Sequence, residues 1–131
     1  SGCLMQMVNH CAINRIPTLG VCLGHQAIGE YFGAQLIKSK VPMHGKISSI
    51  SHVNHPLFTD IPSPYEVCRY HSLAIAVAPS SDLEVIAESQ YNEVMAIAHH
   101  TLPLWGVQFH PESIQTQFGK QLIQNWLKYC V

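Results

Sequence analysis

The chain has 131 residues, of which 47% are hydrophobic and 11% are charged, and its formal net charge is −1. This size and composition suit one globular domain with a sizeable core and argue against a disordered segment. The seven basic residues form no cluster, and no apolar stretch is long enough to span a bilayer, so we expect neither nucleic acid nor a membrane as a partner.

The cysteines and histidines give no sign of a metal centre. The five cysteines are irregularly spaced and lack the Cys-x-x-Cys pairs of zinc sites, which favours a reducing, cytoplasmic setting. The nine histidines are scattered and form no His-Glu-x-x-His pattern. We therefore expect no metal and no cofactor.

The first third of the chain predicts a strand-turn-helix unit. Apolar residues at positions 4, 7, 8, 11 and 12 predict a helix over residues 4–13 that covers a sheet. Residues 18–22 form a short apolar run after Pro17, typical of a buried parallel strand. A helix over residues 26–32, closed by Gly33, follows. This order indicates a doubly wound α/β sheet.

The remainder predicts further strands and a final helix. The last two strands form a hairpin around residues 100–103, and the final helix has an apolar face that packs on the sheet. The expected strands are residues 35–38, 46–50, 66–70, 83–88, 94–98 and 104–109, and the expected helix is residues 117–129.

The segment Gly20-Val21-Cys22-Leu23-Gly24 is a Gly-x-Cys-x-Gly turn at the end of the apolar strand. Glycines on both sides allow a tight turn that holds the Cys22 side chain clear of the sheet, as a nucleophile requires. The helix that follows supplies backbone N–H groups and a positive dipole end, which favour a thiolate and a developing oxyanion. A buried core cysteine is the alternative interpretation.

His110 and Glu112 follow the strand that begins near Leu104. In an extended chain, side chains two residues apart point to the same face, so the carboxylate can orient an imidazole that activates the thiol. Taken separately, His110 could be a hydrogen-bonded histidine at a strand end, and Glu112 could cap a helix. Together with Cys22 they predict a Cys-His-Glu catalytic triad.

These motifs, with Met43-His44-Gly45-Lys46 and Arg69-Tyr70-His71-Ser72-Leu73, resemble the class I glutamine amidotransferases. Within that family the chain is most similar to the small subunits of anthranilate synthase and aminodeoxychorismate synthase. The resemblance implies a three-layer α/β fold with a mostly parallel central sheet. It also implies that Cys22 attacks the side-chain amide of L-glutamine and releases ammonia, through a glutamyl thioester, to a chorismate-binding synthase large subunit.

The resemblance also implies further site residues. Leu23, Gln26, Ser72 and Leu73 would bind the glutamine substrate, with Gln26 and the backbone of the Ser72-Leu73 turn at its α-amino acid end. His44, Gly45 and Lys46 would contact the synthase subunit. For each group a plain alternative stays open, namely a solvated helix residue at Gln26, a strand end at Ser72 and a surface turn at His44.

The resemblance implies that residues 1–131 form one amidotransferase domain, equivalent to roughly the C-terminal two thirds of the family's domain. The family has a further N-terminal part. The chain opens at Ser1-Gly2-Cys3, already in the helix before the nucleophile strand, so we expect an N-terminally truncated domain. The absent region would supply one oxyanion donor, and losing such a donor typically costs ~100- to 1,000-fold in turnover. We therefore expect this piece alone to be nearly inactive.

Two other functions are consistent with the sequence. A catalytically impaired fragment or non-catalytic partner-binding module would keep its biological output after Cys22→Ser. A different thiol hydrolase, such as a peptidase or esterase, would turn over acyl or peptide substrates without selectivity for glutamine. The matches at Gln26 and Ser72 make the hydrolase the weaker of the two.

Overall fold

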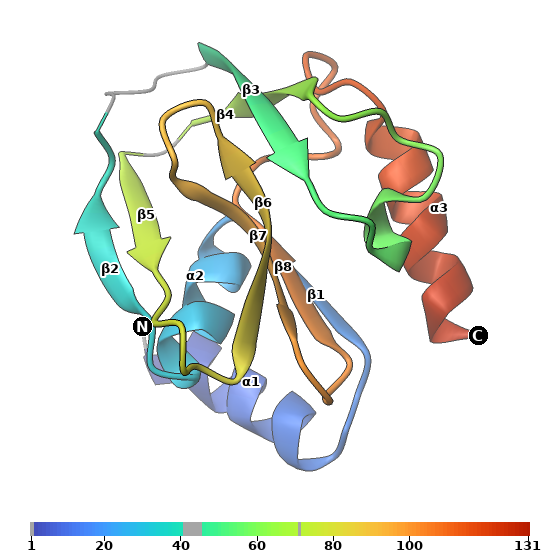
Figure 1. Cartoon of the computed structure of the whole chain (residues 1–131). Coiled ribbons are helices and arrows are strands. Elements are labelled where there is room, and N and C mark those ends of the chain that lie inside the picture. The colour runs from blue at the N-terminus through green and yellow to red at the C-terminus, as the bar shows by residue number, and fades with distance from the viewer. Residues whose placement is uncertain (1, 41–45, 71) are drawn as a thin grey trace.

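The computed structural model describes residues 2–40, 46–70 and 72–131. Helices pack on both faces of a six-stranded sheet, which confirms the predicted three-layer α/β fold (Figure 1). The helices are α1 (Gly2–Ile13), α2 (Leu23–Tyr31) and α3 (Gly119–Cys130), with the 3₁₀ turn η1 (Pro56–Phe58). The strands are β1 (Thr18–Val21), β2 (Gln35–Lys38), β3 (Lys46–His52), β4 (Tyr65–Arg69), β5 (Leu73–Ala76), β6 (Leu83–Ser89), β7 (Val94–His99) and β8 (Leu104–Val107).

The larger sheet has the strand order β1-β8-β7-β6-β3-β4. Among the described residues, only β1 and β8 pair in parallel, with Val21 opposite Val107, and the other pairings in this sheet are antiparallel. The expectation of a mostly parallel sheet therefore does not hold for this part of the chain. The reason is local, because β6, β7 and β8 follow one another through short turns that only antiparallel neighbours allow.

A second, two-stranded sheet pairs β2 with β5 in antiparallel fashion. The sequence predicted β2 with its observed bounds, but β5 was missed because residues 73–76 are a four-residue apolar run directly after a turn. Lys38 lies opposite Leu73 in this pairing. This two-stranded sheet therefore holds the end of β2 next to the Ser72-Leu73 segment.

Two hydrophobic clusters occupy the two faces of the larger sheet. Alternation along β7 sends Ile97 to the cluster under α1 and α2, and its neighbours Ala96 and Ala98 to the cluster under α3. In α3, Leu122 is fully buried, whereas Leu127 is 57% exposed. Among the described residues, no helix is both long and apolar enough to cross a membrane.

Candidate active site

Cys22 occupies a strained turn between β1 and α2. Its backbone angles are φ 64° and ψ −102°, and the residue is only 5% exposed. Its backbone N–H donates to the carbonyl oxygen of Val107 on β8, at 2.8 Å. A non-glycine residue held in such a sparsely populated backbone conformation costs about 1–3 kcal/mol, and residues of this kind cluster at active sites. The fold therefore holds Cys22 in a conformation that core packing alone does not need.

The two glycines that flank Cys22 have different roles. A Cβ atom on Gly20 would lie 2.5 Å from the backbone carbon of Gly24, so only glycine fits where the turn folds back on the strand. A Cβ atom on Gly24 would have no atom within 4 Å. The prediction that both glycines relieve crowding is therefore confirmed for Gly20 and wrong for Gly24.

The amino end of α2 lies at the Cys22 turn. The helix begins at Leu23, directly after Cys22, and its first intrahelical bond runs from the N–H of Gln26 to the carbonyl of Cys22. The earlier N–H groups of the first turn have no intrahelical acceptor, and they carry the positive end of the helix dipole. This arrangement suits negative charge on a sulfur or on an oxyanion beside it.

His110 and Glu112 are joined by a short hydrogen bond, with 2.7 Å between Nδ1 of His110 and Oε2 of Glu112. The two residues lie in a turn rather than in an extended strand, since β8 ends at Val107 and the N–H of Ser113 donates to the carbonyl of His110. The turn, not strand alternation, brings the side chains together. The backbone of His110 is fixed further by Thr116, whose hydroxyl donates to the His110 carbonyl at 2.7 Å.

The parallel pairing of β1 and β8 places Cys22 and His110 at the same edge of the sheet. Val21 and Val107 lie opposite each other, Cys22 follows the first, and His110 comes three residues after the second. Carboxyl ends of neighbouring parallel strands are where α/β proteins build their sites. The geometry thus brings a cysteine, a histidine and a carboxylate to one end of two adjacent strands.

The four residues predicted to bind substrate line one cavity of about 150 Å³. Leu23 and Gln26 come from α2, while Ser72 and Leu73 come from the turn that begins β5. Gln26 is 5% exposed, and its side-chain N–H donates to Oε1 of Gln108 at 3.3 Å. The cavity therefore lies directly beside the Cys22 turn.

Tyr70 is a fifth residue of this cavity, and the sequence singled it out only as part of a motif. Its ring packs edge-on against the ring of His110, with 5.3 Å between the centroids. Tyr70 therefore links the cavity wall to the histidine. In the sequence, its position just before the Ser72-Leu73 turn was the feature that could have predicted its place in the cavity.

The predicted partner-contact segment is only partly described. His44 and Gly45 lie outside the described residues. Lys46 is the first residue of β3 and lies opposite Arg69 in the ladder with β4.

The histidines outside the pair with Glu112 do not assemble a metal site. Within residues 2–40, 46–70 and 72–131, no group of three His, Cys, Asp or Glu side chains could hold a metal ion. His25 is fully buried in α2, and that burial lowers its pKa from 6.5 to about 4, opposed weakly by the backbone of Gly106. Neither of its ring nitrogens makes a hydrogen bond of good geometry within the described part of the chain.

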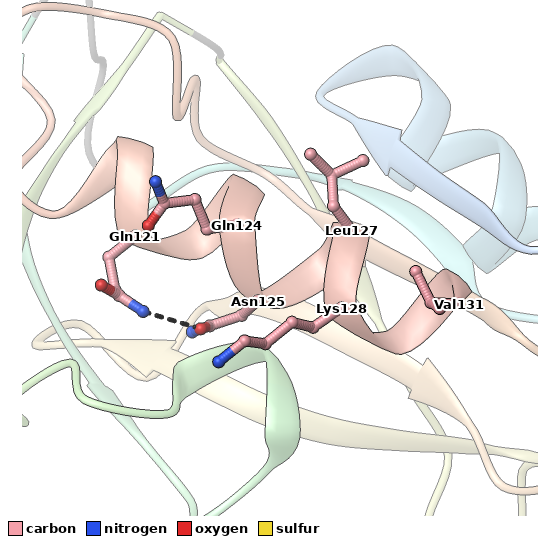
Figure 2. Close-up of a pocket in the computed structure, with 6 residues that line it drawn as sticks. All are labelled: Gln121, Gln124, Asn125, Leu127, Lys128 and Val131. Atoms are coloured by element: carbon pink, nitrogen blue, oxygen red, sulfur yellow. Dashed lines mark hydrogen bonds between the residues drawn. The ribbon is translucent and has the colours of Figure 1, made fainter.

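A larger hollow, of about 390 Å³, runs along the outer side of α3 (Figure 2). Within it, the side-chain amide of Gln121 donates to Oδ1 of Asn125 at 2.8 Å. None of its lining residues belongs to β1, to α2 or to residues 108–112, which contain or flank Cys22 and His110. Its lining residues include no carboxylate, histidine or cysteine side chain.

Comparisons with known proteins place the chain in a family. The family model described as Glutamine amidotransferase class-I matches residues 1–130. Anthranilate synthase component 2 of Azospirillum brasilense is 42% identical over 129 residues, which are 97% of this chain and 65% of that protein. Aminodeoxychorismate synthase component 2 of Serratia marcescens is 42% identical over 132 residues, which are 97% of this chain and 69% of that protein.

A solved structure gives the same picture. A Thermoplasma acidophilum protein, described as a candidate subunit of GMP synthase, superposes with a TM-score of 0.88 at 31% sequence identity. The match covers 97% of this chain and 63% of that one. The chain thus spans about two thirds of the length of each of these relatives. With the family model, the relatives and the fold in agreement, this chain belongs to the class I glutamine amidotransferase family.

Proposed function

We propose that the protein containing this chain hydrolyses L-glutamine through Cys22, His110 and Glu112. The Cys22 thiolate attacks the side-chain amide carbon, and a sulfur-carbon bond forms as the carbonyl oxygen becomes an oxyanion. The first-turn N–H groups of α2 would stabilise that oxyanion. The carbon-nitrogen bond then breaks, the amide nitrogen takes a proton from His110 and leaves as ammonia, and a glutamyl thioester remains.

His110 then works in the opposite direction. It takes a proton from a water molecule that attacks the thioester, and the sulfur-carbon bond breaks to release glutamate and regenerate the thiolate. Glu112 accepts the Nδ1 hydrogen of the ring at 2.7 Å, which leaves Nε2 for the proton transfers. The carboxylate also stabilises the positive ring that forms in each step.

The cavity beside Cys22 is the proposed site for the rest of the substrate. Leu23 and Gln26 form one wall, and the Ser72-Leu73 turn forms the other. A glutamine seated there would extend its amide toward Cys22, while its α-amino and α-carboxyl groups meet Gln26 and the backbone of the turn. The partly exposed side chains of Leu23, Tyr70 and Leu73 at the mouth of the cavity would exclude part of the water.

One observation supports this proposal most directly. The His110-Glu112 hydrogen bond lies at the sheet edge where the strained Cys22 turn emerges, and the cavity opens next to both. A purely structural cysteine would need neither the positive φ nor a neighbouring imidazole-carboxylate pair.

The ammonia is proposed to serve a synthase partner in the reducing cytoplasm. Relatives named anthranilate synthase component 2 and aminodeoxychorismate synthase component 2 support the choice of a chorismate-binding large subunit for that partner. His44, Gly45 and Lys46 are the proposed contact segment. Mixing the protein with each large subunit, chorismate and glutamine tests the choice, because the product is anthranilate with one and aminodeoxychorismate with the other.

The catalytic proposal is tested on the protein that contains this chain. It is labelled with a thiol-reactive glutamine analogue, the label is detected by intact mass, and glutamate release is measured in parallel. We expect one label at Cys22, and loss of both label and glutamate release in Cys22→Ser. Cys11→Ser, which changes a half-buried cysteine of α1, is the matched control and keeps both. Glutamate release that persists in Cys22→Ser would disprove the triad, and labelling that ignores excess glutamine would favour a general thiol hydrolase.

A further inference from the structure

Arg69 and Glu93 form a buried ion pair close to the cavity. Nη1 of Arg69 lies 2.7 Å from Oε1 of Glu93, and the side chains are 0% and 2% exposed. Arg69 ends β4, and Glu93 directly precedes β7. Removing two charges from water is expensive, and buried pairs often contribute little net stability compared with apolar side chains. What this pair holds in place is therefore more informative than the pair itself.

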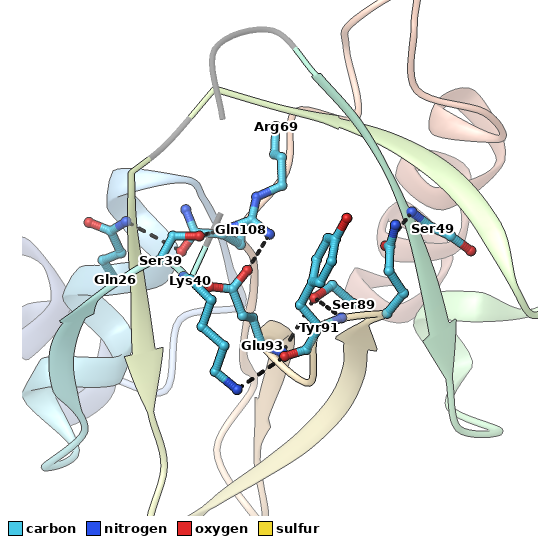
Figure 3. Close-up of polar contacts among 10 residues, drawn as sticks. Gln26, Ser39, Lys40, Ser49, Arg69, Ser89, Tyr91, Glu93 and Gln108 are labelled. Carbon is cyan, nitrogen blue, oxygen red and sulfur yellow. Dashed lines mark hydrogen bonds and ion pairs between the residues drawn. The ribbon is translucent and has the colours of Figure 1, made fainter. Parts of the chain in front are cut away.

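The pair holds the segment that follows β2. Nη2 of Arg69 donates to the hydroxyl oxygen of Ser39 at 3.1 Å, and the backbone N–H of Lys40 donates to Oε2 of Glu93 at 2.9 Å (Figure 3). The ammonium of Lys40 reaches the carbonyl of Tyr91, in the turn before Glu93, at 3.2 Å. Ser39 and Lys40 are thus anchored by side chain and by backbone.

Charge at Glu93 is maintained by these same contacts. Burial alone would raise the pKa of the Glu93 carboxyl, but hydrogen bonds from Ser39, Arg69 and the backbone of Lys40, with the positive charge of Arg69, lower that pKa overall. The carboxylate is therefore ionised at neutral pH, and each of its contacts is a strong, charge-assisted one.

The anchored segment leads directly to the cavity wall. The backbone N–H of Ser39 donates to the carbonyl of Ser72 at 2.7 Å, and the next pairing in the two-stranded sheet is Lys38 with Leu73. Both Ser72 and Leu73 line the cavity. On the other side of the pair, Arg69 is joined by one peptide bond to Tyr70, which lines the cavity and packs on His110.

The opposite wall of the cavity, formed by Leu23 and Gln26, is connected to β7, the strand that Glu93 directly precedes. Gln26 donates to Gln108, whose own backbone N–H donates to the carbonyl of Met95 on β7, two residues after Glu93. Figure 3 shows the Gln26-Gln108 bond and the Arg69-Glu93 pair within one group of polar side chains. Both walls of the cavity are therefore tied to the region around Glu93.

We propose that Arg69 and Glu93 are positioning residues for the glutamine cavity. They fix Ser39 and Lys40, and through the Ser39-Ser72 bond they fix the backbone that receives the α-amino acid end of the substrate. This inference rests on the proposed glutaminase function. Because the pair touches neither Cys22 nor the amide, its loss raises KM for glutamine and leaves kcat nearly unchanged.

The test measures KM and kcat for glutamine, with thermal unfolding, on the protein that contains this chain. Ser39→Ala keeps both buried charges and removes only the hydroxyl, which accepts a hydrogen bond from Arg69 and donates one to Glu93. We expect KM to rise several-fold with kcat within about twofold. Ser81→Ala is the matched control, because Ser81 is also half-buried and its hydroxyl oxygen accepts a backbone N–H in a turn away from the cavity. It leaves KM unchanged.

A second variant removes the ion pair without leaving a lone buried charge. R69M/E93L replaces both members by apolar side chains, which typically preserves stability. We expect near-normal thermal unfolding and a KM raised about tenfold, since Ser39 and Lys40 lose both anchors. Glu93→Gln leaves the buried Arg69 charge without a carboxylate partner. If that variant does not fold, the result shows only a structural effect, and Ser39→Ala then tests the positioning role.

The outcomes separate the inference from the function on which it rests. Unchanged KM in folded Ser39→Ala, or in folded R69M/E93L, overturns the positioning role while the glutaminase proposal stands. A fall in kcat with no change in KM also overturns it, since it would place the pair in the chemistry of the triad. Absence of glutamine hydrolysis in the unmodified protein overturns the function first, and the inference with it.

Discussion

Gly106 on β8 and His25 on α2 fit against each other so closely that no larger residue fits at position 106. A Cβ atom there would lie 2.9 Å from Nδ1 of His25 and 3.1 Å from its Cα. The contact lets α2 approach the sheet at the point where β8 runs toward His110. Because of this close packing, the imidazole of His25 is fully buried, and within the described residues its ring nitrogens lack hydrogen bonds of good geometry.

That burial predicts a stability that depends on pH. The pKa of His25 falls from 6.5 to about 4 on folding, because burial disfavours the charged ring. Between these values the unfolded chain binds a proton that the folded chain does not, so the free energy of unfolding decreases as the pH falls from 6.5 toward 4. Each pH unit contributes up to about 1.4 kcal/mol, or about 3 kcal/mol over the whole window.

The contribution of His25 is isolated by His25→Leu, measured by denaturant unfolding over the same pH range. Leucine fills most of the space, cannot be protonated and brings no polar atom of its own into the core. We expect the variant to lose less stability than the unmodified protein below pH 6.5. His55 and His99 also have pKa values lowered mainly by burial, so some acid sensitivity remains. Parallel curves for the two proteins would contradict the prediction.

The two glycines of the Cys22 turn predict opposite results for the same substitution. Gly20→Ala forces a Cβ into the backbone of Gly24, so we expect a loss of at least about 1–3 kcal/mol and misplacement of Cys22. Gly24→Ala lies in α2 with open space around the new Cβ, so we expect no loss and a gain of about 0.5–1 kcal/mol. Thermal unfolding and analogue labelling measure both effects, and equal destabilisation by the two variants would contradict the geometry.

Local patterns predicted the elements that surround the site. The strand at residues 18–22, the helix after it and the final helix all depend on periodicity and turn residues close in sequence, and each is present within a few residues of its expected bounds. The resemblance to the amidotransferases placed Leu23, Gln26, Ser72 and Leu73 in one group, and the structure places them around one cavity. Their role in binding glutamine stays a prediction.

Contacts between distant segments could not be predicted from the sequence. Arg69 and Glu93 are 24 positions apart and carry no local pattern that marks them as partners. Gln108 meets Gln26 across 82 positions for the same reason. The short strand β5 was missed because a four-residue apolar run has no period of its own, and only its ladder with β2 defines it. These features depend on strand order, which a single sequence does not give.

The hollow on α3 predicts a structural effect without a catalytic one. The amide of Asn125 donates to the carbonyls of Leu57 and Thr59, at 2.8 and 2.9 Å, and so ties α3 to η1. Asn125→Ala leaves both carbonyls without this partner, and we expect a loss of about 1–3 kcal/mol. Gln124→Ala changes the neighbouring, exposed residue and is the matched control. Glutamine hydrolysis per folded molecule stays unchanged in both, and its loss in folded Asn125→Ala would connect α3 to the site.

Glu112→Gln predicts the reverse, a catalytic effect with little change in stability. The Glu112 side chain is 67% exposed, and a pair of this kind contributes only about 0–1 kcal/mol to folding. Its charge, however, faces the ring that becomes positive during proton transfer, so we expect kcat for glutamine to fall about 100-fold with KM nearly unchanged. Glu88→Gln, at an exposed position of β6, controls for loss of one negative charge and keeps full activity. A Glu112→Gln protein with normal kcat would show that His110 does not need this carboxylate, and the third member of the triad would have to be withdrawn.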